Sequence, residues 1–315
     1  MQIVILDAYS VDPGDLGFDR LKEFGTLNIY DRTPPEETAK RIYGADIVLT
    51  NKVAIGEKEL ERARNLRFIG VLATGYNIID TAACARRSIT VCNVPAYSTD
   101  AVAQHTFALL LEICNAVAHH DLQVHRGRWS ACPDFCFWDM PLTELAGKTM
   151  GVFGTGRIGC RVARIAEAFG MRVLGTSRHE APGFAGQYVP FEQMLAESDV
   201  LSLHCPATPE TERLINEDTL ARMKDGAILI NCARGTLIDA EAVARALDSG
   251  KLRAYGTDVA EREPMPRTDP LLTAKNCVIT PHHAWAPFEA RQRLMRVTEE
   301  NIRAFLNGEP VNRVN

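Results

Sequence analysis

The sequence lacks the features expected of a secreted or a nucleic-acid-binding protein. Its nine cysteines are odd in number and form no paired CxxC arrays, which predicts a reduced chain without a disulfide framework. Acidic residues outnumber basic ones, 40 to 35, and the net charge of −5 argues against binding to nucleic acid or an anionic membrane. The first residues, MQIVILDAYS, have neither a basic segment nor a long apolar run, so we expect no signal peptide and a cytoplasmic location.

No apolar stretch is long enough to predict a membrane-spanning helix. The most apolar later segment, FALLLEIC, is short and carries Glu112. A composition of 46% hydrophobic and 24% charged residues is typical of a folded globular chain, and no solenoid repeat or low-complexity tract is present. At 315 residues, the chain is long for one domain and natural for two.

Short β-branched runs alternate with amphipathic stretches along almost the whole chain. The first series predicts strands at 3–6, 47–50, 68–73 and 89–94, and helices at 18–24, 57–64 and 101–120. The second series predicts strands at 148–154, 172–177, 199–205, 226–233, 254–259 and 276–281, a helix capped by Asp239, and a last helix at 287–308. Because continuously apolar strands between helices indicate parallel sheets covered on both faces, we expect an α/β protein with two doubly wound parallel-sheet domains.

A glycine-rich turn follows the first strand of the second series. The segment KTMGVFGTGRIGCRVARIAEAFG places Gly154, Gly156 and Gly159 in a G-x-G-x-x-G pattern between a strand and an amphipathic helix. In dinucleotide-binding folds, the first glycine permits the tight turn, the second lets the backbone approach the pyrophosphate, and the third lets helix and strand pack closely. The N–H groups at the start of the helix then face the phosphates. The sequence therefore predicts a dinucleotide site.

The next strand ends without the acidic residue that usually binds the ribose about 20 residues after the glycines. Ser177 stands at that place, followed by Arg178. A carboxylate there would repel a 2′-phosphate, whereas Arg178 could pair with one bidentately. We therefore expect NADP(H) to be preferred and NAD(H) to be tolerated. In the alternative interpretation, Arg178 points to solvent and Glu180 or another group binds the ribose.

Polar residues end three later strands, in the stretches INCARGTLID, TDVAEREP and TPHHAW. In doubly wound sheets, sites lie outside the carboxyl ends of the strands, where these residues would be. An Arg can bind a carboxylate with two hydrogen bonds, a His can transfer a proton near neutral pH, and a Glu can orient that His. This combination suits the reduction of a 2-keto acid by hydride from a nicotinamide.

Over essentially its whole length, the sequence resembles the D-isomer-specific 2-hydroxyacid dehydrogenases. The signatures are the glycine motif, HCPATPET at 204–211, NCARGTLID at 231–239, DVAEREP at 258–264 and TPHHA at 280–284. The resemblance implies that Arg234 binds the substrate, that Glu263 is the partner of the catalytic histidine, and that His282 is the acid/base. Glu261 and His283 are the neighbouring alternatives, and the family pattern favours Glu263 before Pro264 and His282 after Pro281.

The resemblance also implies a domain arrangement and two sets of binding residues. Residues 1–98 and 286–315 would form a flavodoxin-like substrate domain, a Rossmann cofactor domain at 99–285 would be inserted into it, and the cleft between them would close on substrate in a homodimer. The implied cofactor contacts are Gly154, Thr155, Gly156, Arg157, Ile158, Gly159, Ser177, Arg178, His204, Cys205, Pro206, Thr211, Cys232, Ala233, Arg234, Asp258, His282 and Ala284. The implied substrate contacts are Asn51, Lys52, Thr74, Gly75, Arg234 and His282.

Cysteine and histidine clusters do not predict further chemistry. Cys205 and Cys232 are expected to pack as small apolar residues, because nothing basic accompanies them. The histidines of HHDLQVH and the pair Cys132 and Cys136 lack a second set of ligands, so we expect no metal.

Within the family, the segments LATGYN, DFCFWD and TPHHAW most resemble the glycerate dehydrogenase and hydroxypyruvate reductase branch. The aromatic loop lies where relatives place a dimerisation arm, so Phe137 or Trp138 would reach the partner's active site, although aromatic loops are as often plain interface core. D-lactate and phosphoglycerate dehydrogenases are alternative enzyme classes. A dinucleotide-sensing corepressor is the alternative without catalysis, and a 2-keto acid turnover assay separates it from an enzyme.

The serine at the ribose position yields a direct test of cofactor choice. Replacing Ser177 by Asp should shift the preference toward NADH, because the new carboxylate would bind the ribose hydroxyls and repel a 2′-phosphate. The measurement is kcat/KM for NADPH and for NADH in both proteins. An unchanged ratio would contradict the expected role of this corner.

Overall fold

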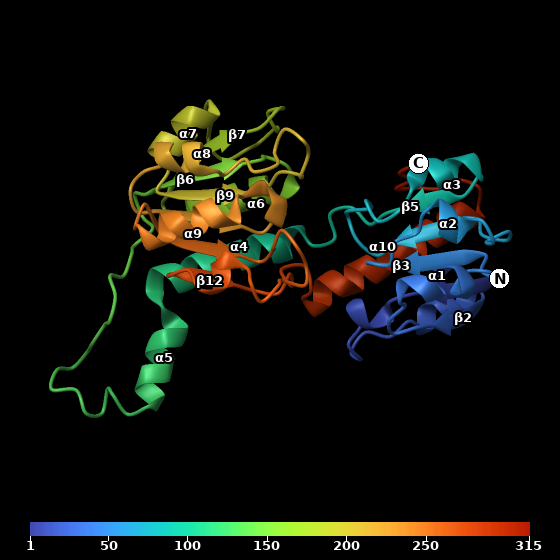
Figure 1. Cartoon of the computed structure of the whole chain (residues 1–315), viewed down its shortest axis with the longest axis horizontal. Coiled ribbons are helices and arrows are strands. Elements are labelled where there is room, and N and C mark those ends of the chain that lie inside the picture. The colour runs from blue at the N-terminus through green and yellow to red at the C-terminus, as the bar shows by residue number, and fades with distance from the viewer. The chain divides into compact units, whose positions relative to one another are not determined.

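In the computed structural model, which describes residues 1–315, the chain forms two compact units. Unit 1 consists of Met1–Ser98 and Ala286–Asn315, and unit 2 of Thr99–Trp285 (Figure 1). Unit 2 is therefore an insertion between two segments of unit 1.

Unit 1 contains a five-stranded parallel sheet in the order β2-β1-β3-β4-β5. This is the flavodoxin-like order, in which the chain reverses direction across the sheet between β1 and β3. The strands are β1 (Gln2–Ile5), β2 (Thr26–Ile29), β3 (Ile47–Thr50), β4 (Phe68–Val71) and β5 (Thr90–Cys92). The helices are α1 (Pro35–Arg41), α2 (Glu57–Leu60), α3 (Thr81–Arg86) and α10 (Phe288–Leu306), with 3-10 turns at Ala8–Ser10 and Asp19–Phe24.

The last helix completes the core of unit 1. Helix α10 packs on β4, where the rings of Phe68 and Phe305 lie 5.0 Å apart between centroids. Phe68 is fully buried, as are all four residues of β3 and of β4. A strand buried on both faces is continuously apolar, which is why these strands were readable in the sequence.

Unit 2 contains a seven-stranded parallel sheet in the order β12-β11-β10-β9-β6-β7-β8. Counted from β6, this is the Rossmann order with one additional edge strand, and its reversal lies between β6 and β9. The strands are β6 (Thr149–Phe153), β7 (Arg172–Thr176), β8 (Gln187–Tyr188), β9 (Val200–Leu203), β10 (Ala227–Asn231), β11 (Leu252–Thr257) and β12 (Cys277–Ile279). The helices are α4 (Thr99–Asn115), α5 (Val117–His125), α6 (Arg157–Ala168), α7 (Phe191–Glu197), α8 (Glu217–Arg222) and α9 (Ala240–Asp248), with 3-10 turns at Gly235–Leu237 and Pro270–Leu272.

The two sheets confirm the α/β class and the doubly wound parallel architecture. The capping role predicted for Asp239 is also present, because its carboxylate accepts a hydrogen bond from the N–H of Ala242 at 3.0 Å at the start of α9. Two helices of the first series are shorter or tighter than expected. Residues 19–24 form a 3-10 helix, and the helix that begins at Glu57 ends at Leu60.

The long helix expected at 101–120 is wrong as a single element. Ala116 has a left-handed backbone, with φ +47°, and divides it into α4 and α5. Helix α4 packs on the sheet of unit 2 with eight buried residues, whereas α5 has none. The apolar stripe therefore packs against the core along α4, as far as Cys114, whereas the residues of α5 are not buried.

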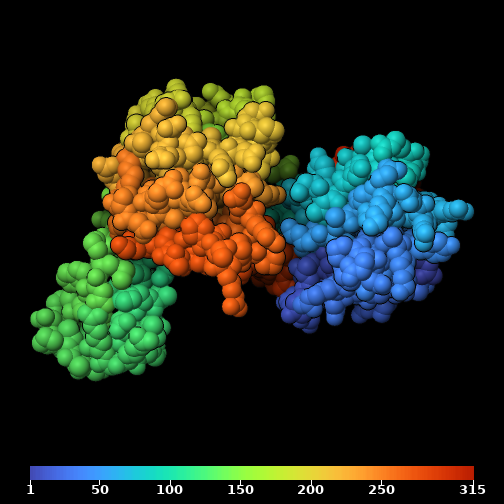
Figure 2. Space-filling model, viewed as in Figure 1, coloured from blue at the N-terminus to red at the C-terminus, as the bar shows by residue number.

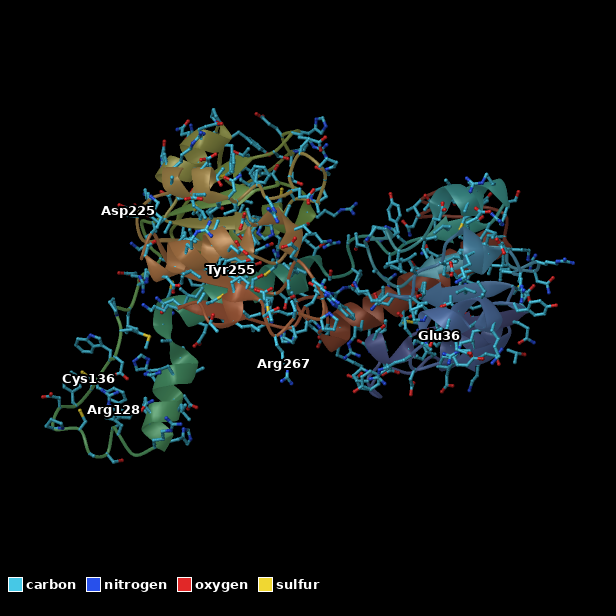
Figure 3. The ribbon with its side chains drawn as sticks, in the orientation of Figure 1. Glu36, Arg128, Cys136, Asp225, Tyr255 and Arg267 are labelled. Atoms are coloured by element: carbon cyan, nitrogen blue, oxygen red, sulfur yellow. The ribbon has the colours of Figure 1, made fainter.

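Helix α5 and the loop that follows it form an arm, residues 117–142, that projects from the rest of unit 2 (Figure 2). Arg128 lies over the ring of Phe137 at 4.4 Å and pairs with Asp139, which also accepts from His119 at 2.7 Å. Arg128 and Cys136 are labelled on this arm in Figure 3. Its side chains thus bond to one another while its apolar groups remain exposed, among them Val117, Leu122, Trp129, Phe135, Trp138 and Leu142.

No single helix is both long and apolar enough to cross a membrane. Helices α4 and α5 reach the length and apolar composition of a membrane span only when they are taken together, and the chain bends by 56° between them.

Candidate active site

The glycine-rich turn connects β6 to α6 at the point where the strand order of unit 2 reverses. Gly154 has φ +97°, and a Cβ there would lie 2.6 Å from the carbonyl oxygen of His204, which follows β9. A Cβ on Gly159 would overlap the carbonyl oxygen of Gly154. Nothing lies within 4 Å of a Cβ on Gly156. Two glycines are therefore required by contacts within the chain, and the third keeps an open approach to the backbone.

The start of α6 faces this open approach. The helix begins at Arg157, directly after Gly156, and no side chain caps it. The N–H groups of Arg157, Ile158 and Gly159 precede the first intrahelical hydrogen bond and are donors for an anion. The open backbone at Gly156 and this uncapped helix start fit the pyrophosphate of a dinucleotide.

The corner expected to receive the ribose lies directly after β7. Ser177, Arg178 and Glu180 are all exposed there, so the residues themselves leave both interpretations of the corner open. The pKa of Glu210 is lowered, chiefly by a hydrogen bond from Thr208 and in smaller part by the charge of Arg178. The charge of Arg178 therefore acts on Glu210, in the loop that follows β9, where further cofactor contacts are expected.

That loop is held by its own hydrogen bonds. The hydroxyl of Thr211 donates to the carbonyl of Pro206 at 2.9 Å and accepts from the N–H of Thr208 at 2.8 Å. At its start, burial lowers the pKa of His204 to about 4, so this imidazole is neutral at pH 7 beside the hydroxyl of Ser202 at 2.8 Å. The loop is thus hydrogen-bonded within itself, and His204 at its start adds no charge.

Three side chains predicted to contact the cofactor are turned into the protein. Thr155 is 1% exposed, and its hydroxyl accepts from the hydroxyl of Tyr188 at 2.9 Å, so only its main chain can face a ligand. Burial raises the pKa of Cys205 to about 11 and that of Cys232 to about 12. Both thiols stay protonated at neutral pH, as expected of packing residues.

Glu263 and His282 form the closest polar pair among the predicted catalytic residues. Nδ1 of His282 lies 2.6 Å from Oε2 of Glu263, and the other carboxylate oxygen accepts from the N–H of Ala260 at 3.1 Å. Both side chains are partly exposed. A carboxylate on Nδ1 fixes the orientation of the ring and leaves Nε2 to exchange a proton with a ligand.

The adjacent histidine points elsewhere. The ring of His283 meets the ring of His105 edge to face, with centroids 5.0 Å apart. His282 has φ +52°, a left-handed conformation that turns the chain between the two rings. Its carbonyl accepts from the indole N–H of Trp285 at 2.9 Å. Only His282 is paired with a carboxylate in the arrangement expected of an acid/base residue.

Arg234 lies in the turn after β10, and its exposed guanidinium donates to the carbonyl of Ala233 at 2.7 Å. The turn is fixed by Asn231, whose fully buried amide donates to the carbonyl of Arg234 at 2.9 Å and accepts from the N–H of Ala233 at 3.0 Å. A Cβ on Gly235 would overlap the main chain of Ala260. This close approach brings the turn that carries Arg234 against the loop that leads to Glu263.

Asp258 follows β11 and is 1% exposed. Its carboxylate accepts from the N–H groups of His283 at 3.0 Å and Ala284 at 2.8 Å. Ala284, also a predicted cofactor contact, is itself buried. The structure thus uses Asp258 to hold the segment that carries His282, and a contact with the cofactor remains a prediction.

The substrate contacts predicted in unit 1 follow β3 and β4. Asn51 is 4% exposed and its amide donates to the hydroxyl of Ser10 at 3.1 Å, while the carboxylate of Asp7 accepts from the N–H groups of Asn51 at 2.9 Å and Lys52 at 2.6 Å. Asn51 therefore supports the loop, and the exposed Lys52 is the better candidate for a ligand contact.

The second pair lies after β4. The carbonyl of Thr74 accepts from the amide of Asn93 at 2.7 Å, and its hydroxyl donates to the carbonyl of Val94 at 2.9 Å. The bond to the carbonyl fixes the direction of the peptide between Thr74 and Gly75, and the N–H of Gly75 in that peptide is an expected donor to a carboxylate.

A cavity of about 480 Å³ opens at the carboxyl ends of β1, β2 and β3 of unit 1. Its lining includes Tyr9, Ser10, Arg32, Thr38 and Lys52. Lys52 links it to the predicted substrate residues, whereas Thr74 and Gly75 are not part of the lining.

Several structurally important residues were missed in the sequence. Asn231 and Thr280 are polar residues at the ends of apolar strands, a pattern that marks strand ends at functional edges. Tyr188 and His105 gave no comparable signal, because a tyrosine in an edge strand and a histidine in an apolar helix usually pack.

Comparisons with known proteins identify the family of the chain. The model of the NAD binding domain of the D-isomer specific 2-hydroxyacid dehydrogenases matches residues 107–284. The full length of the chain is 48% identical to a hydroxypyruvate reductase of Blautia hydrogenotrophica and covers all of that protein. The chain belongs to the D-isomer specific 2-hydroxyacid dehydrogenase family. The dehydrogenase also matches a solved structure from Thermus thermophilus, with a TM-score of 0.88 and 37% identity over 100% of both chains.

A third relative bears on the cofactor. An acyclic imino acid reductase, solved in complex with NADPH and D-Arg, has a TM-score of 0.86 and is 32% identical over 100% of both chains. The dehydrogenase is thus an NAD(P)-dependent oxidoreductase that acts on the CH–OH group of small 2-hydroxy acids. The expected family, enzyme class and nicotinamide dinucleotide cofactor are confirmed.

The two neighbouring histidines can be separated by substitution. His282→Ala should lower kcat about 10²- to 10⁴-fold, because it removes the imidazole that is paired with Glu263. His283→Ala should retain most of kcat, since its ring faces His105 instead. The measurement is steady-state turnover of a 2-keto acid, and the reverse ranking of the two variants would contradict the assignment.

Proposed function

We propose that this dehydrogenase is a hydroxypyruvate and glyoxylate reductase. It reduces hydroxypyruvate to D-glycerate and glyoxylate to glycolate, and it oxidises D-glycerate in the reverse reaction. The hydrogen bond of 2.6 Å between His282 and Glu263, on the loops after β12 and β11, is the observation that carries the proposal. The hydroxypyruvate reductase that is 48% identical over the full chain supports the choice of substrate.

Reduction of a 2-keto acid adds a hydride to C2 and a proton to the carbonyl oxygen. The bound nicotinamide supplies the hydride. His282 supplies the proton from Nε2, while Glu263 holds Nδ1 and stabilises the charged ring before transfer. In the oxidation of D-glycerate, the same Nε2 accepts the hydroxyl proton.

Arg234 recognises the substrate in this proposal. Its guanidinium can form two parallel hydrogen bonds with a carboxylate or bridge the carboxylate and the 2-keto oxygen. Because Asn231 fixes the turn from beneath, the side chain starts from a defined position. Preorganised donors of this kind stabilise the charge that develops on the carbonyl oxygen.

In unit 1, the N–H groups of Thr74 and Gly75 are proposed as donors to a carboxylate. Lys52 is proposed as a further cation near the substrate, beside the 480 Å³ cavity. Glyoxylate is smaller than hydroxypyruvate, so a site that accepts the larger acid accepts both.

For the cofactor, NADP(H) is proposed as the preferred form, with NAD(H) as a second. Ser177 carries no charge to repel a 2′-phosphate, and the neighbouring Arg178 is exposed and can pair with one. The structural relative in complex with NADPH shows that a protein of this fold can use that cofactor.

A homodimer is proposed through the arm of residues 117–142. Phe135 is 89% and Trp138 65% exposed, although internal ion pairs hold the arm in a defined shape. Exposed aromatic groups on an ordered segment are typical of protein interfaces. A second copy of the chain is the proposed partner.

Initial rates with hydroxypyruvate under matched NADPH and NADH test substrate and cofactor together. We expect turnover with both and a higher kcat/KM with NADPH. A clear advantage for NADH would mean that the ribose is held by another group, which makes glycerate oxidation the favoured direction. Absence of turnover with either cofactor would contradict the proposed substrate and redirect the assay to other 2-keto acids.

The arm yields a separate test. Trp138→Ala should weaken dimerisation and raise the KM for hydroxypyruvate, because the indole is proposed to contact the partner. Sedimentation equilibrium and steady-state kinetics measure the two effects. Val117→Ala, which trims a smaller exposed side chain at the base of the arm, is the matched control. If both the KM and the dimer are unchanged in Trp138→Ala, Trp138 has no such role.

A further inference from the structure

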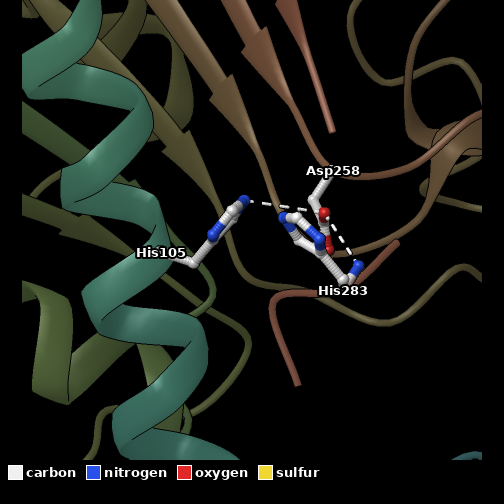
Figure 4. A group of neighbouring side chains, drawn as sticks. All are labelled: His105, Asp258 and His283. Carbon is white, nitrogen blue, oxygen red and sulfur yellow. Dashed lines mark hydrogen bonds and ion pairs between the residues drawn. The ribbon is translucent and has the colours of Figure 1, made fainter. Parts of the chain in front are cut away.

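A hydrogen-bond network beneath His282 includes two residues that have no assigned role. His105 lies on α4, and Thr280 directly follows β12. Asp258 and His283 complete the group, and Figure 4 shows how the side chains of His105, Asp258 and His283 converge below the strand ends. All four residues belong to unit 2.

The hydroxyl of Thr280 connects helix and carboxylate. Its oxygen lies 2.6 Å from Oδ1 of Asp258 and 2.8 Å from Nε2 of His105. An ionised carboxylate only accepts hydrogen bonds, so the single hydroxyl hydrogen of Thr280 goes to Asp258. The same oxygen must then accept from His105, which requires the hydrogen of that ring to be on Nε2.

The surroundings of His105 favour this state. Burial lowers its pKa, the negative charge of Asp258 opposes the effect, and the neighbouring His283 adds to the decrease. A neutral ring with hydrogen on Nε2 donates to Thr280 and adds no charge to the site. The bonds therefore run in one direction, from His105 through Thr280 to Asp258.

The network ends on the main chain around His282. Asp258 accepts from the N–H groups of His283 and Ala284, and the N–H of His282 donates to the carbonyl of Thr280 at 3.0 Å. His282 lies between these anchors and has a left-handed backbone, with φ +52°. A left-handed backbone at a residue other than glycine persists only where its surroundings enforce it.

We propose that His105 and Thr280 are positioning residues that hold the turn 280–284 in the shape that directs His282 toward Glu263. This inference rests on the proposed acid/base role of His282. Helix α4 contributes one side chain, His105, which bonds to Thr280 and through it to the carboxylate that supports the turn. In this proposal α4 and the loop after β12 act as one support.

The same side chains raise the question of a metal ion. One ligand atom each from His105, Asp258 and His283 lies within 4.8 Å of the others. Three donors already occupy the carboxylate of Asp258, and Nε2 of His105 is bonded to Thr280. A cation would have to displace these bonds, so the geometry favours the hydrogen-bond network. A metal site would need the ring of His283 as a ligand, whereas the hydrogen-bond network needs only the main-chain N–H of His283.

The test is a set of paired variants in the full-length protein. Thr280→Val removes the hydroxyl at nearly constant shape, and Thr280→Ser restores it. His105→Leu removes the donor, and His105→Gln returns an N–H group near the position of Nε2. We expect Thr280→Val and His105→Leu to lower kcat about 10- to 100-fold, because the catalytic histidine is displaced. Thr280→Ser and His105→Gln should recover most of this loss.

The kinetic signature separates positioning from general destabilisation. The KM for hydroxypyruvate and the Kd for NADPH should stay within about twofold in Thr280→Val, because Arg234 and the glycine-rich turn, which are proposed to bind the substrate carboxylate and the pyrophosphate, are unchanged. The solvent deuterium isotope effect on kcat should rise as proton transfer from a misdirected His282 becomes limiting. A loss that Ser does not rescue, or an increase in KM that accounts for the loss, would overturn the proposal.

Two further variants distinguish the remaining outcomes. His283→Ala keeps the N–H that Asp258 binds, so it should retain turnover within about threefold of the parent, since no binding group is removed. Losses in His283→Ala equal to those in His105→Leu, together with inactivation by EDTA and recovery with Zn²⁺, would replace the network by a metal site. If His282→Ala remains active, the acid/base role fails; if it is inactive while Thr280→Val is unchanged, only the positioning role fails.

Discussion

Parallel pairing of the strands is the constraint on which the organisation of unit 2 depends. All seven strands run in one direction, so their carboxyl ends meet along one edge of the sheet. The turns after β6, β7, β9, β10, β11 and β12 carry the residues of unit 2 that are proposed for cofactor binding, substrate binding and proton transfer. Because the central strands β9 and β10 are buried on both faces, their side chains are committed to packing, and the chemistry is left to the turns.

Contacts between these turns are close enough to restrict which residues can occupy them. Gly154 and Gly235 each lie against the main chain of another loop, and neither position has room for a side chain. Buried or half-buried groups support the turns from below, namely the amide of Asn231, the hydroxyl of Thr280 and the carboxylate of Asp258. Glu263 and Arg234, the charged residues proposed to act on the substrate or on His282, are in contrast partly or fully exposed. The arrangement separates rigid, buried positioning groups from charged groups that can reach a ligand.

Local patterns in the sequence were sufficient for the features that depend on neighbouring residues. The glycine motif predicted the turn between β6 and α6, and Asp239 predicted the start of α9. The pairing of Glu263 with His282 came from a family resemblance, because 19 residues separate the two in the chain. Sequence patterning could not reveal that helix 101–120 breaks at Ala116, since the apolar stripe continues through the break. Nor could it reveal that Asn51 is turned inward to Ser10 or that His105 reaches Thr280, because those contacts depend on tertiary packing over 41 and 175 residues.

The insertion of unit 2 has a consequence for the order in which the protein is made. Unit 1 needs α10, which supplies Phe305 to the ring of Phe68, and that helix emerges from the ribosome only after the whole of unit 2. Unit 2 is continuous in the chain and can fold while α10 is still being synthesised, because domains generally fold as units during translation. Until α10 is made, the five-stranded sheet lacks the helix that covers β4. The nascent amino-terminal segment is therefore the part of the chain for which a chaperone would matter most.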